Sequence, residues 1–159
     1  MSIRVQQLGK VYGEQQALKA ISFEASAGAV LGFLGPNGAG KSTTMKILTG
    51  FIPPSSGSAM VAGFDVQKDS MEVRRRLGYL PEHNPNYLDL YIRESLLFFA
   101  RLHKISKPEQ RVKEVIEQTG IGRESHKKIG MLSKGYRQRV GLAQALVHDP
   151  EVLILDEPT

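Results

Sequence analysis

The first part of the chain alternates between short apolar and polar stretches of the kind that form β-strands. The segments "SIRVQQL" and "AISFEASAG" come first, and the second places Ile21, Phe23 and Ala25 on one face. Residues 29–35, "AVLGFLG", form a continuous apolar run, which predicts a strand buried on both faces. Another strand-like segment, "SAMVAGFDV", follows the loop "IPPSSG". We therefore expect the N-terminal part to be rich in strands.

Helical spacing replaces this pattern in the middle of the chain. The segment "YIRESLLFFARLHKI" has the length and periodicity of a helix. Ser106 and Glu109 have the spacing of a capping box, which predicts the start of another helix. Residues of about 87–130 are expected to be all-helical and inserted between two αβ parts. A last helix from about Tyr136 to Val147 then leads into the closing strand "EVLILD".

Composition narrows the class of protein. At 159 residues and 41% hydrophobic, the chain is predicted to form one soluble domain with a real core. The net charge of +5 comes from interspersed residues, and the basic runs 74–76 and 127–128 favour solvated faces over a nucleic-acid or lipid site. The absence of cysteine excludes disulfides and thiol chemistry. No apolar run is long enough to span a membrane, and no signal region is expected.

A phosphate-binding loop is predicted at residues 35–43. The stretch "GPNGAGKST" fits the pattern G-x-x-x-x-G-K-[ST], with a predicted strand before it and a helix, "TMKILT", after it. Its glycines let backbone N–H groups approach a polyphosphate at a helix N-terminus, where the dipole favours anions. A glycine-rich turn with an incidental lysine is the alternative, at odds on the order of one in a hundred. The predicted nucleotide-binding residues are Gly35, Pro36, Asn37, Gly38, Ala39, Gly40, Lys41, Ser42 and Thr43.

Two residues of this loop have distinct expected roles. Lys41 can reach the β- and γ-phosphates as a point charge, and the Ser42 hydroxyl can bind Mg²⁺.

Two carboxylates lie at the end of the strand "VLILD", near the end of the chain. Asp156 is predicted to support Mg²⁺, and Glu157 points the other way and could polarise an attacking water as a general base. Acids after an apolar strand are common, so only the combination with the loop predicts a magnesium–nucleotide site.

The stretch "LSKGYRQR" at 132–139 distinguishes among nucleotide-binding families. Ser133 can cap the helix that follows, and Gly135 keeps the backbone bare at its start. A simple capped helix is the alternative. The region "LSKGYRQRVGLAQALVHDPEVLILDEPT" resembles the signature and Walker B region of ABC ATPases, and most of all the ATP-binding subunits of bacterial exporters, including the gliding-motility-associated group. The resemblance covers the whole chain.

The resemblance implies a fold class: an α/β P-loop NTPase with an ABC-type core, an N-terminal antiparallel β subdomain and an inserted α-helical subdomain. Residues 1–159 are then a single, partial ABC ATP-binding domain. Residues 1–86 and 136–159 are expected to form the β subdomain and P-loop core, and residues 87–135 the helical subdomain with the signature. The similar proteins carry further strands and a switch histidine after "DEPT", so we expect the chain to be truncated there.

Further site residues follow from the resemblance. Tyr12 matches the aromatic that stacks on adenine, although it could instead cover the core. Glu82 lies where the family has a glutamine that approaches Mg²⁺. Its carboxylate can still bind the metal, but it adds a negative charge beside the phosphates. Lys134 and Tyr136 replace a glycine and a glutamine of the usual signature, and their effect stays open. The retained residues are Ser133 and Gly135, which are expected to contact the γ-phosphate across a dimer.

The resemblance also implies an activity. The expected protein is an ATP hydrolase with ATP and Mg²⁺ as cofactors, in which Lys41 and Glu157 are catalytic. It would act with a transmembrane permease and a second ATP-binding subunit, without nucleic acid, at the cytoplasmic face of the cell membrane, to drive export. The alternatives are a soluble ABC-type ATPase outside transport and an ATP-binding fragment that does not hydrolyse ATP. The absence of an N-K-x-D motif argues against a GTPase. The four histidines lack zinc-type spacing and are read as surface or packing residues.

Overall fold

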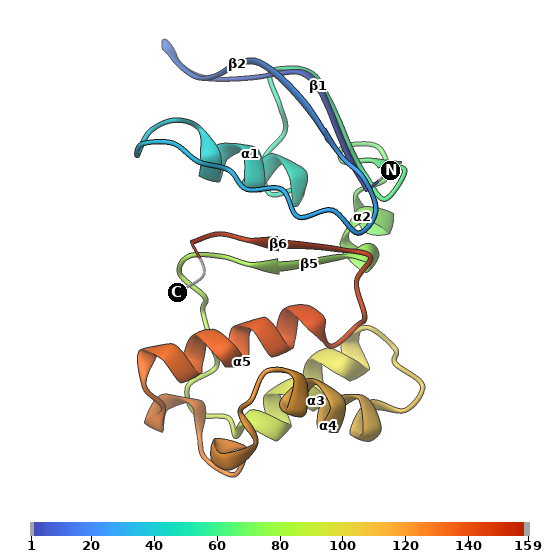
Figure 1. Ribbon diagram of the computed structural model, residues 1–159, viewed down its shortest axis with the longest axis vertical. Coiled ribbons are helices and arrows are strands. Elements are labelled where there is room, and N and C mark those ends of the chain that lie inside the picture. Colours follow the sequence, from blue (N-terminus) through green and yellow to red (C-terminus); the bar gives the residue numbers. More distant parts are fainter. Residues whose placement is uncertain (1, 158–159) are drawn as a thin grey trace. The chain divides into compact units, whose positions relative to one another are not determined.

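The structure is a computed structural model that describes residues 2–157. The chain divides into two compact units, the first ending at Leu77 and the second beginning at Gly78. Figure 1 shows the strands and short helices of the first unit and the helices of the second. Each unit is described by itself below. The expected division into residues 1–86 with 136–159, and 87–135, remains a proposal.

The first unit is built on an antiparallel sheet. Its strands are β1 (Ile3–Tyr12), β2 (Gln15–Ala25), β3 (Ser56–Val61) and β4 (Phe64–Asp65), in the order β2-β1-β3-β4. The predicted N-terminal antiparallel sheet is therefore confirmed. The segment read as one strand-like stretch is a β3–β4 hairpin, because Gly63 has a left-handed φ of 84° between the two strands.

Two helices accompany this sheet. Helix α1 (Lys41–Leu48) buries Ile47 and Leu48, and the sheet contributes Val5, Leu8 and Leu18 to the buried apolar residues of the unit. Helix α2 (Ser70–Arg76) follows β4. Helix α1 confirms the helix predicted after the phosphate loop, and burial of these aliphatic side chains is the main stabilising term of such a layer.

The predicted strand at residues 29–35 is wrong in the structure. Residues 29–36 have no regular secondary structure, and Val30 and Leu34 are 100% and 97% exposed. A β-strand needs at least one neighbouring strand to pair with its backbone N–H and C=O groups. Within residues 2–157 no strand pairs with this segment. Phe33 is half-buried, unlike its exposed neighbours, because its ring packs edge-on against Phe23 with centroids 4.9 Å apart.

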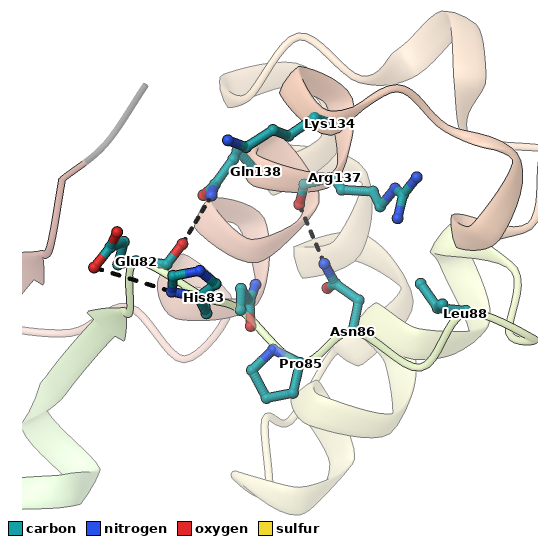
Figure 2. Close-up of a pocket in the computed structure, with 9 residues that line it drawn as sticks. Glu82, His83, Pro85, Asn86, Leu88, Lys134, Arg137 and Gln138 are labelled. Atoms are coloured by element: carbon teal, nitrogen blue, oxygen red, sulfur yellow. Dashed lines mark hydrogen bonds and ion pairs between the residues drawn. The ribbon is translucent and has the colours of Figure 1, made fainter.

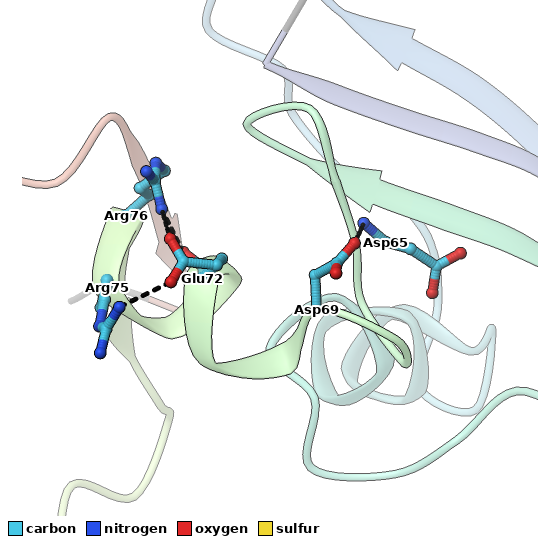
Figure 3. Close-up of polar contacts among 5 residues, drawn as sticks. All are labelled: Asp65, Asp69, Glu72, Arg75 and Arg76. Atoms are coloured by element: carbon cyan, nitrogen blue, oxygen red, sulfur yellow. Dashed lines mark hydrogen bonds and ion pairs between the residues drawn. The ribbon is translucent and has the colours of Figure 1, made fainter.

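The basic run at 74–76 lies on α2. Glu72 accepts hydrogen bonds at 2.6 Å from the guanidinium groups of both Arg75 and Arg76, as Figure 3 shows. The bonds to Arg76 and Arg75 and their positive charges lower the pKa of Glu72 below its ordinary value. Arg76 also lies over the Phe64 ring, 4.4 Å from its centroid. The positive charge of this run is therefore partly neutralised by Glu72 of the same helix.

The second unit packs three helices together and carries a two-stranded sheet. The sheet pairs β5 (Leu77–Leu80), which starts at the junction of the units, with β6 (Val152–Leu155), and Figure 1 draws the two strands running in the same direction. The helices are α3 (Ile92–Leu102), α4 (Pro108–Gln118) and α5 (Lys134–Leu146), with short 3₁₀ turns at 122–124 and 129–131. Their facing apolar side chains are fully or nearly fully buried, among them Ile92, Leu96, Val112, Val115, Ile116, Val140 and Ala143.

The helix starts differ from one expectation. Helix α4 begins at Pro108 with Lys107 as its N-cap and no side-chain capping bond, so the predicted capping box of Ser106 and Glu109 is wrong. Because the cap residue is one position later than expected, Ser106 lies outside the capping position. Proline at the first helical position still marks the start, since it needs no N–H partner there.

Candidate functional site

The phosphate-loop residues lie in the first unit, immediately before α1. Gly38 and Gly40 have φ values of 82° and 85°, a region that side-chain-bearing residues rarely adopt. Gly40 is the N-cap of α1, and its carbonyl accepts from the Thr44 N–H at 2.9 Å and from the Thr44 hydroxyl at 2.9 Å. Gly40, which the motif requires, and Gly38 inside the motif therefore form a tight turn into a helix N-terminus, which favours anions.

The Lys41 side chain folds back across this loop. Its Nζ donates to the carbonyl oxygens of Gly35 and of Pro36, the latter at 2.9 Å. Ser42 is exposed and Thr43 half-buried at the same end of the helix. The loop between Gly35 and Lys41 is open to solvent over most of its length. An ammonium group, a hydroxyl group and a helix N-terminus therefore lie on one accessible segment, which is the donor set that a polyphosphate with Mg²⁺ requires.

The β1–β2 hairpin packs against the end of this loop. A side chain at Gly40 would lie 2.5 Å from Leu18 Cδ2 and 2.7 Å from the Ala17 carbonyl oxygen of β2, so the backbones approach closely there. Leu18 pairs with Lys10 of β1, and Tyr12 ends that strand. The Tyr12 ring is 45% exposed, with Lys10 Nζ 5.2 Å from its centroid. An exposed aromatic side chain of this kind is suited to stacking on a base.

The closing acids lie in the second unit, just after β6. The Asp156 N–H donates to the Leu80 carbonyl at 2.9 Å, so Asp156 continues the pairing with β5. The Asp156 side chain is nearly buried at 7% exposure, whereas Glu157 is exposed with a left-handed φ of 47°. Burial, and then the charge of Asp156, raise the pKa of the Tyr79 hydroxyl. A buried carboxylate and an exposed one at the end of a strand can serve as metal ligand and base.

The signature residues begin α5. The Ser133 hydroxyl accepts the Tyr136 N–H at 3.3 Å, which confirms Ser133 as the predicted helix cap. Gly135 has open space around its Cα, with nothing within 4 Å of where a Cβ would be. Lys134 is exposed and Tyr136 half-buried, and the Arg139 guanidinium lies 5.5 Å from the Tyr136 ring centroid.

Glu82 follows β5 and lies beside α5. Gln138 Nε2 donates to the Glu82 carbonyl oxygen at 3.3 Å, and His83 Nδ1 lies 3.9 Å from the Glu82 carboxylate. Figure 2 shows these residues around a cleft of about 600 Å³. Residues 82–86 with Leu88 form one wall, and Lys134, Arg137 and Gln138 of α5 form the other. The structure thus brings Glu82 and the start of the signature helix together within one unit.

Sequence reasoning missed the polar residues that join these elements. Asn86 and Gln144 lie 58 positions apart and are bonded at 3.3 Å, and Gln138 contacts the Glu82 backbone. The only signal available was the presence of amide side chains in a loop and on a helix, which does not indicate a pair. Within the described residues of either unit, no three His, Asp and Glu side chains gather as a metal cluster.

The fold and these segments define a class: an α/β nucleotide-binding protein with a phosphate loop at the start of a helix, two acids after a strand, and a capped signature helix. The family model described as ABC transporter matches residues 18–159. This chain belongs to that family.

Curated relatives cover the chain almost completely. The bacitracin transport ATP-binding protein BcrA of Bacillus licheniformis is 41% identical over 157 residues, covering 99% of this chain and 51% of its own length. The Nod factor export ATP-binding protein I of Burkholderia thailandensis is 39% identical over 159 residues, covering 99% of this chain and 52% of its own length. The chain therefore spans about half the length of the curated relatives it matches.

Solved structures confirm the fold class. An ATP-binding subunit of an ABC transporter superposes with a TM-score of 0.89 at 28% identity, covering 99% of this chain and 67% of that one. The dimeric bacterial ABC transporter cassette MJ0796 superposes with a TM-score of 0.87 at 25% identity, covering 99% of this chain and 74% of that one. None of the helices in residues 2–157 has both the length and the apolar character that crossing a membrane demands.

Proposed function

We propose that the protein is the ATP-binding subunit of an ABC transporter that binds and hydrolyses Mg-ATP to drive export through a separate membrane permease. The observation that supports this most is the phosphate loop itself. Its left-handed glycines, Gly38 and Gly40, turn the backbone into the N-terminus of α1, and Lys41 folds over it. That arrangement suits a triphosphate, whose charge the helix dipole and the ammonium group both stabilise.

The other site residues receive roles consistent with their positions. Ser42 and the nearly buried Asp156 are the proposed Mg²⁺ ligands, with Glu82 as a further one, because hard cations prefer oxygen donors. The exposed Glu157 is the proposed general base for the attacking water. Tyr12, 45% exposed, is proposed to stack on the adenine.

The signature supports a dimeric arrangement. Ser133 caps α5, and Gly135 leaves its first turn free of side-chain bulk, so an anion can approach the helix N-terminus. We propose that the γ-phosphate bound by a second ATP-binding subunit occupies this place. One of the superposing cassettes is described as dimeric, which favours the proposal.

Export is favoured by the names of the relatives, one a bacitracin transport protein and one a Nod factor export protein. A permease would place the protein at the cytoplasmic face of the membrane. The exposed aromatic residues Tyr87, Tyr91 and Phe98 of the helical unit offer a surface for that contact. A closer relation to the gliding-motility-associated group remains part of the proposal.

The phosphate loop is tested by MgATP binding to the full-length protein. Lys41→Ala removes the ammonium group and is expected to weaken the affinity at least about tenfold, since a charged hydrogen bond is worth about 1.5–3 kcal/mol. Lys46→Ala, an exposed lysine on the same helix, is the matched control and should bind as the wild type does. Unchanged affinity in Lys41→Ala, measured by calorimetry, would count against the assignment of the loop.

A further inference from the structure

Loop 82–86 is joined to two helices through the amide group of Gln144. Gln144 Nε2 donates to Ser95 Oγ of α3 at 3.1 Å and to Asn86 Oδ1 of the loop at 3.3 Å. Asn86 Nδ2 in turn donates to the Arg137 carbonyl of α5 at 3.4 Å, drawn as a dashed line in Figure 2. Ser95 is fully buried.

The same face of α5 approaches the loop at other points. Gln138 donates to the Glu82 carbonyl at 3.3 Å. A side chain at Gly141 would collide with the Asn84 amide, so the loop lies against bare helix backbone there. Residues 138, 141 and 144 recur at helical spacing and therefore lie on one face of α5. Loop 82–86 runs along this face, from Glu82 at one end to Asn86 at the other.

We propose that Gln144 is a positioning residue, which acts through Asn86 to set the placement of loop 82–86 and hence of Glu82. The two N–H groups of one amide reach acceptors on two different elements, the buried Ser95 of α3 and the Asn86 of the loop. Gln144 of α5 is thus hydrogen-bonded both to α3 and to the loop. A change in the packing of α3 on α5 is passed to the loop through this amide.

This role rests on the proposed ATPase function, because Glu82 is one of its proposed metal ligands. Replacing Gln144 by leucine keeps much of the volume but removes both donors. The half-buried Asn86 Oδ1 and the buried Ser95 Oγ then lose this donor, and a buried acceptor such as Ser95 Oγ without a partner favours rearrangement. At the far end of the loop, Asn86 then keeps only its bond to the Arg137 carbonyl at 3.4 Å, so one side-chain hydrogen bond to α5 holds that end where there were two.

The first test measures hydrogen exchange and ATP hydrolysis in the full-length protein. Gln144→Leu is expected to raise amide exchange within residues 82–88 and to lower kcat roughly tenfold, with KM changed less than about twofold, as the loss of two neutral hydrogen bonds allows. Gln118→Leu, at an exposed glutamine of α4, is the matched control for the substitution itself. Exchange and kcat equal to those of the wild type in Gln144→Leu would overturn the proposal.

A double-mutant cycle separates positioning from general destabilisation. If Gln144 acts through Asn86 on Glu82, Gln144→Leu lowers kcat far less in an Asn86→Ala or Glu82→Ala background than in the wild type. Fully additive effects in both backgrounds would overturn the positioning role, since a purely structural loss is additive. A wild-type protein that binds but does not hydrolyse ATP would instead contradict the proposed function. An active wild type with an unaffected Gln144→Leu variant contradicts the positioning role alone.

Discussion

His103 and His148 stack face to face, with ring centroids 4.0 Å apart and ring planes inclined by 9°. His103 follows the end of α3, and His148 follows the end of α5, so the pair joins the C-terminal ends of these two helices. Burial, and then the neighbouring His148, lower the pKa of His103 below its ordinary value of 6.5. Two stacked imidazoles favour the neutral form because a charged pair would repel.

This stacking predicts a pH dependence of stability. Since the pKa of His103 is lower in the folded state, the unfolded state takes up a proton first as the pH falls below 6.5. The free energy of unfolding is therefore expected to decrease between pH 7.5 and pH 5.5. His103→Phe keeps a stacking ring but cannot be protonated. The decrease in its free energy of unfolding over this pH range should therefore be smaller than that of the wild type. Urea titrations at the two pH values measure this, with the exposed His126→Phe as control. An identical pH dependence in His103→Phe and wild type would contradict the interpretation.

Arg111 is predicted to stabilise the end of α5. Its guanidinium, 17% exposed, donates to the Leu146 carbonyl at 2.7 Å and to the Val147 carbonyl at 3.0 Å. Those carbonyls lie at a helix C-terminus, where a positive charge also interacts favourably with the helix dipole. Arg111→Met should lower the free energy of unfolding by about 2 kcal/mol, and Arg111→Lys should recover only part because it lacks the forked geometry.

Equilibrium denaturation in urea checks this prediction. Arg93→Met, at an exposed arginine of α3, provides the comparison. If Arg111→Met and Arg93→Met shift the midpoint equally, the carbonyl contacts of Arg111 contribute no specific stability.

Gly141 is predicted to be intolerant of any side chain. A Cβ there would collide with the Asn84 amide and lie 2.7 Å from Leu80 Cδ1. In an exposed helix interior, alanine is more favourable than glycine by about 1 kcal/mol. Here we expect Gly141→Ala to destabilise by about 1–3 kcal/mol, as overpacking does. Gly135→Ala, where nothing lies within 4 Å of the added methyl group, should leave the midpoint of thermal unfolding unchanged or raised. A stabilised Gly141→Ala would show that the loop moves away without cost.

Local patterns predicted the helices of the second unit because burial there follows helical spacing. Val112, Val115 and Ile116 are all buried in α4, as their positions along the helix indicate. The turn before α1 was equally accessible from the sequence because it depends on local residues: Gly40, a glycine that the motif requires, and Gly38 both have left-handed backbone. Its role in phosphate binding stays a prediction.

Contacts between distant segments could not be predicted in the same way. The apolar run at 29–35 predicts a buried strand, but a strand also needs neighbours, and no periodicity indicates which segments supply them. The bonds of Gln144 to Asn86 and Ser95 join residues 58 and 49 positions apart. A single amide side chain carries no pattern, so only the folded arrangement shows its partners.

Glu157→Gln is the sharpest test of the chemistry at the end of β6. Glu157 is exposed, whereas its neighbour Asp156 is nearly buried, so the two carboxylates face different surroundings. An amide has nearly the same shape as a carboxylate but cannot accept a proton from water. In the full-length protein we expect nucleotide affinity within about twofold of the wild type and a loss of turnover of about 10²–10⁴-fold, the range typical of a general base. Glu117→Gln, an exposed glutamate of α4, is the matched control, and phosphate release under saturating MgATP is the measurement. Turnover that survives in Glu157→Gln would assign the base to another residue, because the substitution removes only the basic group.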